Sequence, residues 1–490
     1  MGSIACPDIG ESQQNSTIQS ILQQGAARAV VHQLHELFDQ SITAKVLRVA
    51  QKQLDSNTPP TSYPHHVLQS GKGAGLYLSK PIDFWTCGFF PGSIYSLLER
   101  VNKYPESVRT GTKDAIDLPA LRRRLEVLGR TWSDPIHAEA RLTNTHDMGF
   151  IMLPHMRPRW EMYHDEAALA TIITAANNLA TRFDPVVGAI RSWDPEIWQL
   201  VTGGKGRKQN YIVIVDSLMN LDLLYYAAAQ TGNRYLSEVA TSHARVVLGT
   251  HLRPEPKLWR AGYTGMLYSS RHVINFDAAT GDVAERLTAQ GFSADSTWSR
   301  GQAWAITGFA QCYRWTRQPR FLDAACGLAE YFLLQLELAP PCVERLVSGE
   351  IVGRHVPVWD FQAPIENEDA PLRDTSAGVV AAYGMLLLSQ ILSTQGQAAL
   401  GVRYFDSAIR IVQETLKMSL SKPLERLTIG EDGLYTGVGG REGCETFDAI
   451  LRNATVAASP TLPIKVADCG LVYADYFLIE FGTQLLRMGA

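Results

Sequence analysis

The 490-residue sequence has little excess of either charge, since 45 Lys and Arg residues are set against 49 Asp and Glu residues. The formal net charge is −4, and the short basic cluster KGRK at 205–208 is typical of a solvated loop. Nucleic-acid binding needs a concentrated positive surface, so this distribution predicts no nucleic-acid partner.

Cysteine is also sparse, because the seven residues are scattered, odd in number and without any Cys-x-x-Cys pair. This excludes a disulfide framework and a zinc site, and it favours reduced, mostly buried thiols. No stretch approaches the roughly 20 apolar residues that span a bilayer, so we expect no membrane partner. Residues 1–24 lack the basic and then apolar pattern of a secretory signal, so we expect a cytoplasmic protein.

What the sequence does contain is apolar residues at helical spacing, which predicts an all-α fold. Residues 1–25 are polar and are expected to be disordered, whereas 26–490 are expected to form a single domain. A short strand is predicted at 273–277, followed by a turn. Long helices are predicted at about 211–231, 233–249, 302–316, 319–337, 374–394 and 401–418.

A loose internal repeat joins these helices in pairs. Each copy ends one helix with small residues, turns at a Thr, and opens the next helix with aromatic and aliphatic residues. The copies at 225–236, 312–322 and 392–405 recur about every 85 residues, too far apart for a tetratricopeptide-type solenoid. The repeat instead predicts a closed ring of helical hairpins, with a functional site at one mouth.

The segment DSTWSRGQAWAI at 295–306 places Trp298, Arg300 and Trp304 at the start of an apolar helix. Arg offers a planar fork for a carboxylate and Trp a flat face for a sugar ring, so the segment suggests a binding site. The alternative is a buried aromatic cluster in which Arg300 pairs with a structural Asp.

Asp216 follows an apolar run and precedes Leu218 and Met219, so its carboxyl is expected to enter an apolar environment. Desolvation would raise its pKa toward the working pH, as a proton donor requires. The alternative is that Asp216 only caps a helix that begins at Ser217. Asn220 lies four residues on, on the same helical face, within reach of the carboxyl or of a substrate hydroxyl.

A second carboxylate, Asp147, stands beside His146 and two residues before Gly149, where glycine permits a close backbone approach. A structural Asp–His pair is the alternative interpretation. A purely structural role can explain each of these residues when it is taken alone: Asp147, His272, Arg300 and the tryptophans. Taken together, they indicate a site.

Five motifs in a fixed order carry a family resemblance: WTCGFFPG (85–92), THDMGF (145–150), VDSLMNL (215–221) with RSW (191–193), the run from HVINFD (272–277) through QGF (290–292) to 306, and VWDF (358–361) with RDTSA (373–377). Over roughly residues 80–480 the chain resembles glycoside hydrolase family 88, the unsaturated glucuronyl hydrolases. The resemblance implies an (α/α)6 barrel, in agreement with the ring of hairpins.

The resemblance also implies roles for these residues. Asp216 would be the general acid/base and Asp147 the second essential carboxylate. The pocket for an unsaturated uronic acid would be lined by His146, His272, Arg300, Trp304, Gln290, Trp193 and Trp85. Asp216 would protonate C4 of the C4=C5 vinyl ether and then help water to add, with no metal or cofactor required.

Three departures from the family pattern, Ala294, Ser299 and Leu218, are expected to touch the pocket wall, and the loop 195–210 to shape the leaving-group side. They keep open a second interpretation, in which the same machinery acts on a small-molecule enol ether or alkene. An unsaturated rhamnogalacturonyl hydrolase and a non-catalytic carbohydrate-binding toroid are further alternatives.

Overall fold

The structure is a computed structural model that describes residues 30–31, 33–108, 116–194, 211–422, 425–429, 435–438 and 446–489. The segment 1–25 and the loop 195–210, for which the sequence made predictions, lie outside the described residues.

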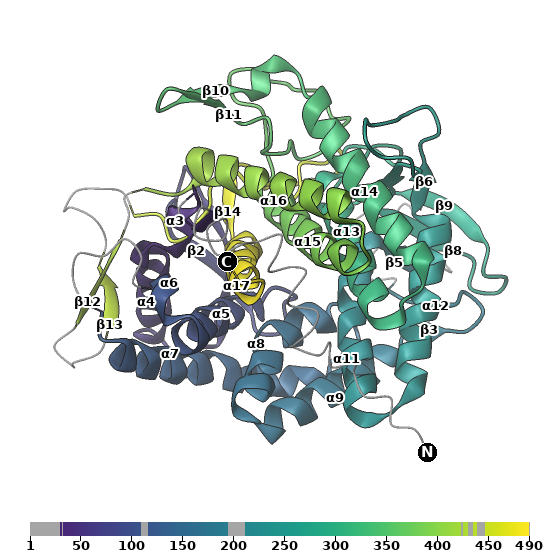
Figure 1. The fold of residues 1–490 in the computed structure, drawn as a ribbon. Helices are drawn as coiled ribbons and strands as arrows, with labels where there is room; N and C mark the ends of the chain where they lie inside the picture. Colours follow the sequence, from purple (N-terminus) through teal and green to yellow (C-terminus); the bar gives the residue numbers. More distant parts are fainter. Residues whose placement is uncertain are drawn as a thin grey trace.

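Within this part of the chain, long helices alternate between an outer and an inner ring. Each inner helix packs against the next, and the last packs against the first, so the ring is closed. Figure 1 shows the inner helices around the middle of the molecule and the outer helices outside them. The inner ring consists of α5 (Phe89–Lys103), α8 (Met148–Tyr163), α11 (Leu221–Thr231), α13 (Ser299–Thr316), α15 (Thr375–Thr394) and α17 (Val472–Arg487). The outer ring consists of α4 (Gln40–Leu54), α7 (Leu118–Ser133), α9 (Glu166–Ala180), α12 (Arg234–Thr250), α14 (Pro319–Leu338) and α16 (Ala398–Ser419).

The residue pattern of each helix explains why it lies in the inner or the outer ring. Outer helices are amphipathic: in α7, Leu121 and Leu125 are buried while Arg122 and Arg123 are exposed. Inner helices are covered on all sides, and α15 accordingly carries small and apolar residues around its whole circumference. The predicted all-α architecture, an (α/α)6 barrel, is therefore confirmed.

One prediction about apolar runs needs correction. Helix α15 is long and apolar enough to cross a membrane by length and composition, although the sequence analysis expected no stretch to approach that limit. In the structure, 89% of that window is buried inside the protein, which is what a core helix of the inner ring requires.

The predicted repeat corresponds to three helical hairpins, α11–α12, α13–α14 and α15–α16, whose partners pack against each other. Most predicted helix bounds agree with the structure, but the helix expected at 211–231 is wrong at its start. Residues 211–214 form a strand, 215–220 form a 3-10 helix, and α11 begins only at Leu221. The run YIVI pairs with a neighbouring strand because β-branched residues favour that state.

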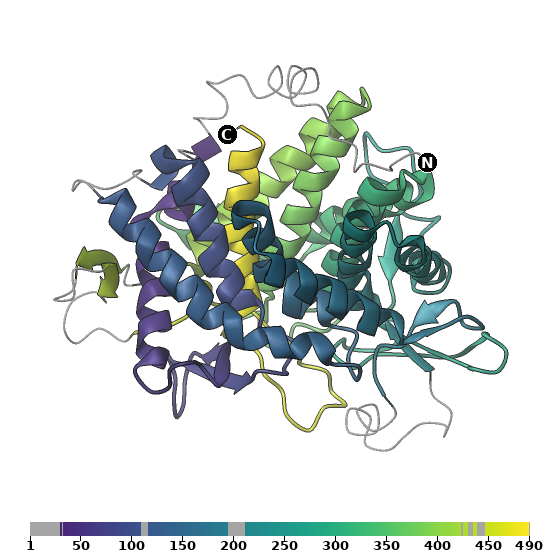
Figure 2. The same ribbon diagram turned by 90° about the horizontal axis from the view of Figure 1, so that it is seen from below.

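Short β-sheets lie in the segments that connect the helices of the ring. The predicted strand near 273–277 is confirmed as β8, which pairs antiparallel with β5 and β9. Figure 2 shows that long connecting segments gather along the lower side of the barrel in that view. The sheets are β14-β1-β2 (Cys469–Leu471, Ser62–Leu68, Tyr77–Pro81), β5-β8-β9 (Tyr211–Ile214, Val273–Phe276, Val283–Leu287), β3-β4 (Phe183–Asp184, Ala189–Ile190), β6-β7 (Leu252–Pro254, Tyr268–Ser270), β10-β11 (Arg345–Val347, Glu350–Val352) and β12-β13 (Arg426–Ile429, Tyr435–Val438). Shorter helical elements are α3 (His35–Phe38), α6 (Pro105–Val108), η1 (Asp134–Arg141), η2 (Val215–Asn220) and η3 (Pro341–Val343).

Candidate active site at the N-terminal mouth of the barrel

The N-terminal ends of the inner helices meet at one mouth of the barrel. Arg300, in the first turn of α13, pairs with Asp374, the N-cap of α15, and lies over the ring of Tyr473 in α17. Trp85, just before α5, contacts Tyr473 and also Phe150 in the first turn of α8, with ring centroids 5.1 and 5.6 Å apart. The predicted site at one mouth of the ring therefore lies at this N-terminal mouth.

Asp216 is held in the 3-10 helix η2, between the end of β5 and the start of α11. Two glycines allow the neighbouring inner helices to approach this turn closely. A Cβ atom on Gly149 of α8 would lie 2.8 Å from Cα of Asn220, and one on Gly308 of α13 would lie 2.6 Å from Cβ of Leu218. Both distances are shorter than real Cβ contacts, so a larger residue at either position would displace the turn that carries Asp216.

The Asp216 carboxyl is buried, and its Oδ1 atom has no hydrogen-bond partner among the described residues. Burial is the main cause that raises its pKa to about 7, with a smaller contribution from the charge of Asp147, while Arg300 opposes the shift. The N-cap of η2 is Ile214, so Asp216 does not act as a simple helix cap. The carboxyl is thus an acid that holds its proton up to neutral pH.

His272 lies beside Asp216 because β8 pairs with β5 and the Val215 amide donates to the His272 carbonyl at 3.0 Å. The backbone amides of Ala289 and Gln290 donate to Nδ1 of His272 at 3.2 and 3.3 Å, so Nδ1 is an acceptor and the proton resides on Nε2. Burial lowers the pKa of His272 to about 3, which keeps the ring neutral. Its Nε2–H group is 3.9 Å from Oδ1 of Asp216, too far for a hydrogen bond, so both groups remain available to a substrate.

Asp147 and His146 form a second cluster at the start of α8. Nδ1 of His146 donates to the Ser192 carbonyl at 2.9 Å, and burial lowers the pKa of the ring. Its Nε2 therefore carries a lone pair and faces Oδ1 of Asp147 at 3.3 Å. Thr145 donates to the other carboxylate oxygen of Asp147 at 3.1 Å. Two acceptors side by side are the arrangement that a sugar hydroxyl satisfies as a donor.

Polar atoms that are buried without a partner gather at this mouth. In native proteins nearly all buried polar atoms are hydrogen-bonded, so such a cluster indicates groups that a ligand satisfies. At this mouth of the described structure they are Oδ1 of Asp216, Nε2 of His272, Nε2 of His146, Nδ2 of Asn220, Oε1 of Gln290, Nε1 of Trp298, Nε1 of Trp304 and the hydroxyl oxygen of Tyr473.

Arg300 is buried and fully engaged in an ion pair. Its Nη1 group donates to Asp374, Ser376 and the Thr455 carbonyl, and its Nη2 group donates to the Val456 carbonyl at 2.6 Å. The guanidinium also stacks over Trp298 with a distance of 4.5 Å to the ring centroid. The structure thus shows the structural pairing that the sequence analysis held as the alternative, and the binding of a uronate carboxylate by Arg300 stays a prediction.

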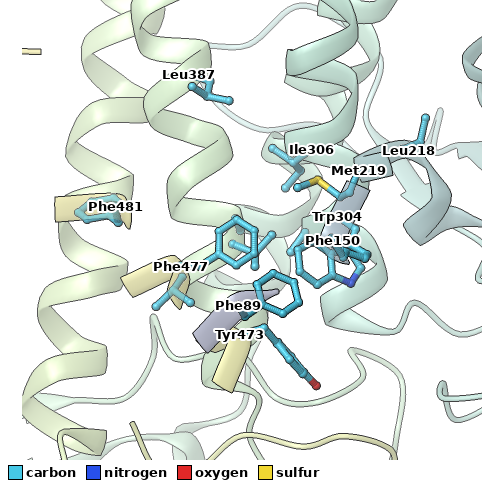
Figure 3. Close-up of a cluster of buried hydrophobic side chains, with 14 of the residues drawn as sticks. Phe89, Phe150, Leu218, Met219, Trp304, Ile306, Leu387, Tyr473, Phe477 and Phe481 are labelled. Carbon is cyan, nitrogen blue, oxygen red and sulfur yellow. The ribbon is translucent and has the colours of Figure 1, made fainter. Parts of the chain in front are cut away.

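The predicted tryptophans occupy different depths. Trp193 lies near His272, with ring centroids 6.2 Å apart, and Trp85 is partly buried at the mouth. Trp304 is completely buried and packs against Phe150 and Phe477, with centroids 5.1 and 5.4 Å away. Figure 3 shows Trp304 and Phe150 together in this aromatic cluster. Trp304 therefore forms the floor beneath the site, and no open stacking face is left for a sugar.

Other polar residues of the 295–306 segment point away from the site, because successive helical residues face different directions. Gln302 donates to the carbonyls of Tyr268 and Leu328, between α13 and α14. Asp295 is exposed and pairs with Arg271. Ser299 donates to the Trp359 carbonyl at 2.9 Å, and Leu218 lies against α13, so these two departures from the family pattern face packing contacts and not the pocket.

Three further side chains lie at this mouth, and the sequence had already pointed to two of them, Trp298 and Asn220. Trp298 packs against His272 with ring centroids 4.6 Å apart, Asn220 accepts from the Phe150 amide through Oδ1 and leaves Nδ2 free, and Tyr473 contacts both Trp85 and Arg300. The sequence indicated Trp298 through the 295–306 segment and Asn220 through its place on the same helical face as Asp216. Tyr473 had no signal beyond its place at the start of an apolar helix. No cluster that could hold a metal ion occurs among the described residues.

The comparisons with known proteins agree with this geometry. No family model matches the chain. The unsaturated glucuronyl hydrolase of Formosa agariphila is 31% identical over 316 residues, which cover 63% of this chain and 64% of that protein. The unsaturated glucuronyl hydrolase of Bacillus sp. GL1 is 29% identical over 322 residues, covering 65% and 71%. A crystal structure of an unsaturated glucuronyl hydrolase specific for heparin matches with a TM-score of 0.65 and 26% identity, over 93% of this chain and 98% of that one.

The barrel, with its buried carboxyl at the N-terminal mouth, has the (α/α)6 architecture that the sequence predicted. In sequence and fold, the chain is similar to the unsaturated glucuronyl hydrolases. The sequence alignment spans just under two thirds of the Formosa agariphila relative.

Proposed function

We propose that the protein is a hydrolase that releases a 4,5-unsaturated uronic acid from the non-reducing end of saccharides. The observation that supports this proposal most is the cluster of unpartnered buried polar atoms around Asp216, whose pKa lies at about 7. The relatives named as unsaturated glucuronyl hydrolases support the same class of substrate.

The proposed reaction begins with proton transfer from Asp216 to C4 of the C4=C5 vinyl ether. This gives an oxocarbenium-like cation at C5, which water attacks to form a hemiketal at C5. The ionised Asp216 then takes a proton from that water and is restored. The hemiketal opens and the aglycone leaves, without direct attack at the anomeric carbon. An acid with a pKa near the working pH serves both proton transfers.

The neighbouring groups have complementary roles in this proposal. Nε2 of His272 and Oδ1 of Asp216 are 3.9 Å apart. A substrate oxygen that binds between these two atoms accepts a hydrogen bond from the Nε2–H group of His272. Asp147 and His146 accept a ring hydroxyl, and the charge of Asp147 stabilises the developing cation. Arg300 lies close enough to Asp216 to lower its pKa, so its positive charge also favours a carboxylate in this mouth.

The test is an absorbance assay on disaccharides made by polysaccharide lyases, whose conjugated uronate band disappears when the C4=C5 bond is hydrated. We expect loss of this band with release of the second sugar. The matched control is the saturated glucuronide of the same sugar, which has no double bond to protonate and should not be cleaved. Cleavage of both at comparable rates would contradict the proposal and favour a two-carboxylate glycosidase that uses Asp147 and Asp216.

A wider substrate panel, with products detected by mass spectrometry and binding by calorimetry, distinguishes the alternatives. An unsaturated rhamnogalacturonyl disaccharide belongs in the panel, and so does a simple cyclic enol ether without a sugar leaving group. Turnover of the enol ether alone would show that the machinery acts on a small-molecule alkene. Binding without turnover of any substrate would indicate a carbohydrate-binding protein.

A further inference from the structure

A cavity of about 1060 Å³ opens at the opposite mouth of the barrel, away from Asp216. It is lined by the C-terminal halves of inner helices, for example by Arg157 of α8, Gln311 of α13 and Arg487 of α17. Neither Asp147, Asp216 nor His272 contributes to it. Cavities of 300–1000 Å³ accommodate small organic ligands, so this one is large enough for a ligand of one or two rings.

An aromatic floor separates this cavity from the N-terminal mouth. The end of the cavity that is nearest the N-terminal mouth is lined by Phe89, Phe150, Met219 and Phe477. They belong to the packed cluster in Figure 3, which also contains the completely buried Trp304. The two mouths are therefore separate compartments, and a ligand in the cavity does not touch the groups of the candidate active site.

The charged residues of the inner cavity wall are already paired, whereas Arg234, Arg314 and Arg317 at the rim are exposed. Arg157 bonds to both Glu161 and Asp222, and Asp222 also accepts from Nε1 of Trp315 at 2.6 Å. Arg487 bonds in the same way to both Glu99 and Glu480. Each arginine serves two carboxylates, so the inner wall offers no free cation to an anionic ligand. The exposed Arg314 and Arg317 at the rim complement the negative C-terminal end of α13.

The polar groups that remain open in the wall are neutral. Oε1 of Gln311 is buried without a partner, and the hydroxyls of Tyr383 and Tyr476 make no hydrogen bond within the described part of the chain. Aromatic faces accompany them, including Trp315, which stacks on Tyr225 with an interplanar angle of 15°. Neutral amide and hydroxyl groups next to flat apolar faces match the hydroxyls and C–H faces of a sugar.

We propose that this C-terminal cavity is a second binding site, which takes a neutral saccharide of one or two rings. The sugar lies on the aromatic floor and wall, and its hydroxyls bond to Gln311, Tyr383 and Tyr476. This site is independent of the proposed reaction, because the aromatic floor separates it from Asp216.

The experiment is calorimetric titration of the wild-type protein with cellobiose, a neutral disaccharide without a C4=C5 bond. We expect one site with a dissociation constant on the order of 1 mM. Tyr383→Phe removes one hydroxyl and keeps the ring, and Gln311→Leu removes the buried amide. Each should weaken binding about 3- to 10-fold, as expected for a lost neutral hydrogen bond. Ala229→Phe, at the cavity wall, should block binding by filling the space.

Two controls assign the binding to the cavity. Asp147→Asn at the N-terminal mouth should leave cellobiose binding unchanged, and the three cavity variants should leave turnover of an unsaturated disaccharide unchanged. Absence of binding at tens of millimolar cellobiose, or its loss in Asp147→Asn alone, would overturn the proposal. Tighter binding of glucuronate or of hexanol than of cellobiose would also overturn it, because the site would then select an anion or an apolar ligand.

Discussion

The two mouths of the barrel are built from opposite ends of the same inner helices, yet their polar groups are organised in contrasting ways. In the C-terminal cavity, the carboxylates of Asp222, in the first turn of α11, and of Glu480 are paired with arginines. At the N-terminal mouth, Asp216 and His272 are buried and 3.9 Å apart, and each keeps an unpartnered atom. Burial without a partner is costly, so a fold retains it where a ligand or a reaction uses it.

The contrast between two buried aspartates illustrates the difference. Asp222 receives hydrogen bonds from Trp315 and Arg157, whereas burial raises the pKa of Asp216 to about 7. They are six residues apart in sequence, on opposite sides of the aromatic floor. The environment of each carboxyl, and not its residue type, decides whether it serves the fold or the chemistry.

The largest expected effect is on catalysis, from Asp216→Asn. The amide has the same shape but cannot deliver a proton, so turnover should fall by about 10²- to 10⁴-fold or more. The matched control is Asp222→Asn, which should retain activity within about twofold while its lost ion pair with Arg157 lowers stability by about 1–3 kcal/mol. Steady-state kinetics and thermal unfolding of both variants measure the comparison. More than about a tenth of wild-type activity in Asp216→Asn would remove Asp216 from its role.

A smaller but still large effect is expected on stability, from Arg300→Ala. Removal of the guanidinium leaves Asp374 buried and unpaired, which costs about 3–5 kcal/mol. The substrate-binding role predicts instead a stable variant whose KM rises roughly 10- to 100-fold. Denaturant unfolding and KM, measured on the same sample, separate the two. Unchanged stability with a raised KM would show that the sequence prediction was right and that the ion pair is secondary.

The pH dependence should separate Asp216 from the paired acids. Its proton donation requires the protonated form, so kcat/KM should fall as the pH rises above about 7. The stability follows from the same shift: the folded-state pKa is above the unfolded value of 3.8, so the folded state binds more protons between about pH 4 and 7. Wild-type stability should therefore fall relative to Asp216→Asn across this window and level off above pH 7. If the unfolding free energies of the two proteins changed in parallel with pH, this would contradict the raised pKa of Asp216.

The smallest of these effects is expected from His272→Phe. The ring packing against Trp298 remains, but the Nε2–H donor beside Asp216 is lost, and turnover should fall about 10-fold. His272→Gln supplies an amide donor and should recover part of the activity. An unchanged rate in His272→Phe would make the histidine a packing residue, comparable to the paired groups of the other mouth.

The sequence predicted the ring of hairpins and the buried environment of Asp216 because both depend on local patterns. Helical spacing of apolar residues predicted the hairpins, and the apolar run before Asp216 predicted a desolvated carboxyl, which its burial confirms. The sequence did not predict the strand at 211–214, because its pairing with β8 depends on residues 60 positions away.

Long-range contacts also explain the other differences. The partner of Arg300 is Asp374, on another inner helix, and Tyr473 reaches the site from the last helix. The closed ring brings these residues together, and no local pattern reveals which polar side chain finds a partner. The depth of Trp304 is a property of the whole aromatic floor for the same reason.

The most direct test of the central claim is turnover of an unsaturated uronyl disaccharide in heavy water. If Asp216 protonates C4 of the vinyl ether, the released keto acid carries one deuterium at C4, which mass spectrometry and proton NMR detect. Asp216→Asn, incubated in parallel, should give neither product nor label. Product formed by the wild-type protein without deuterium at C4 would contradict hydration of the double bond and place the bond cleavage at the anomeric carbon.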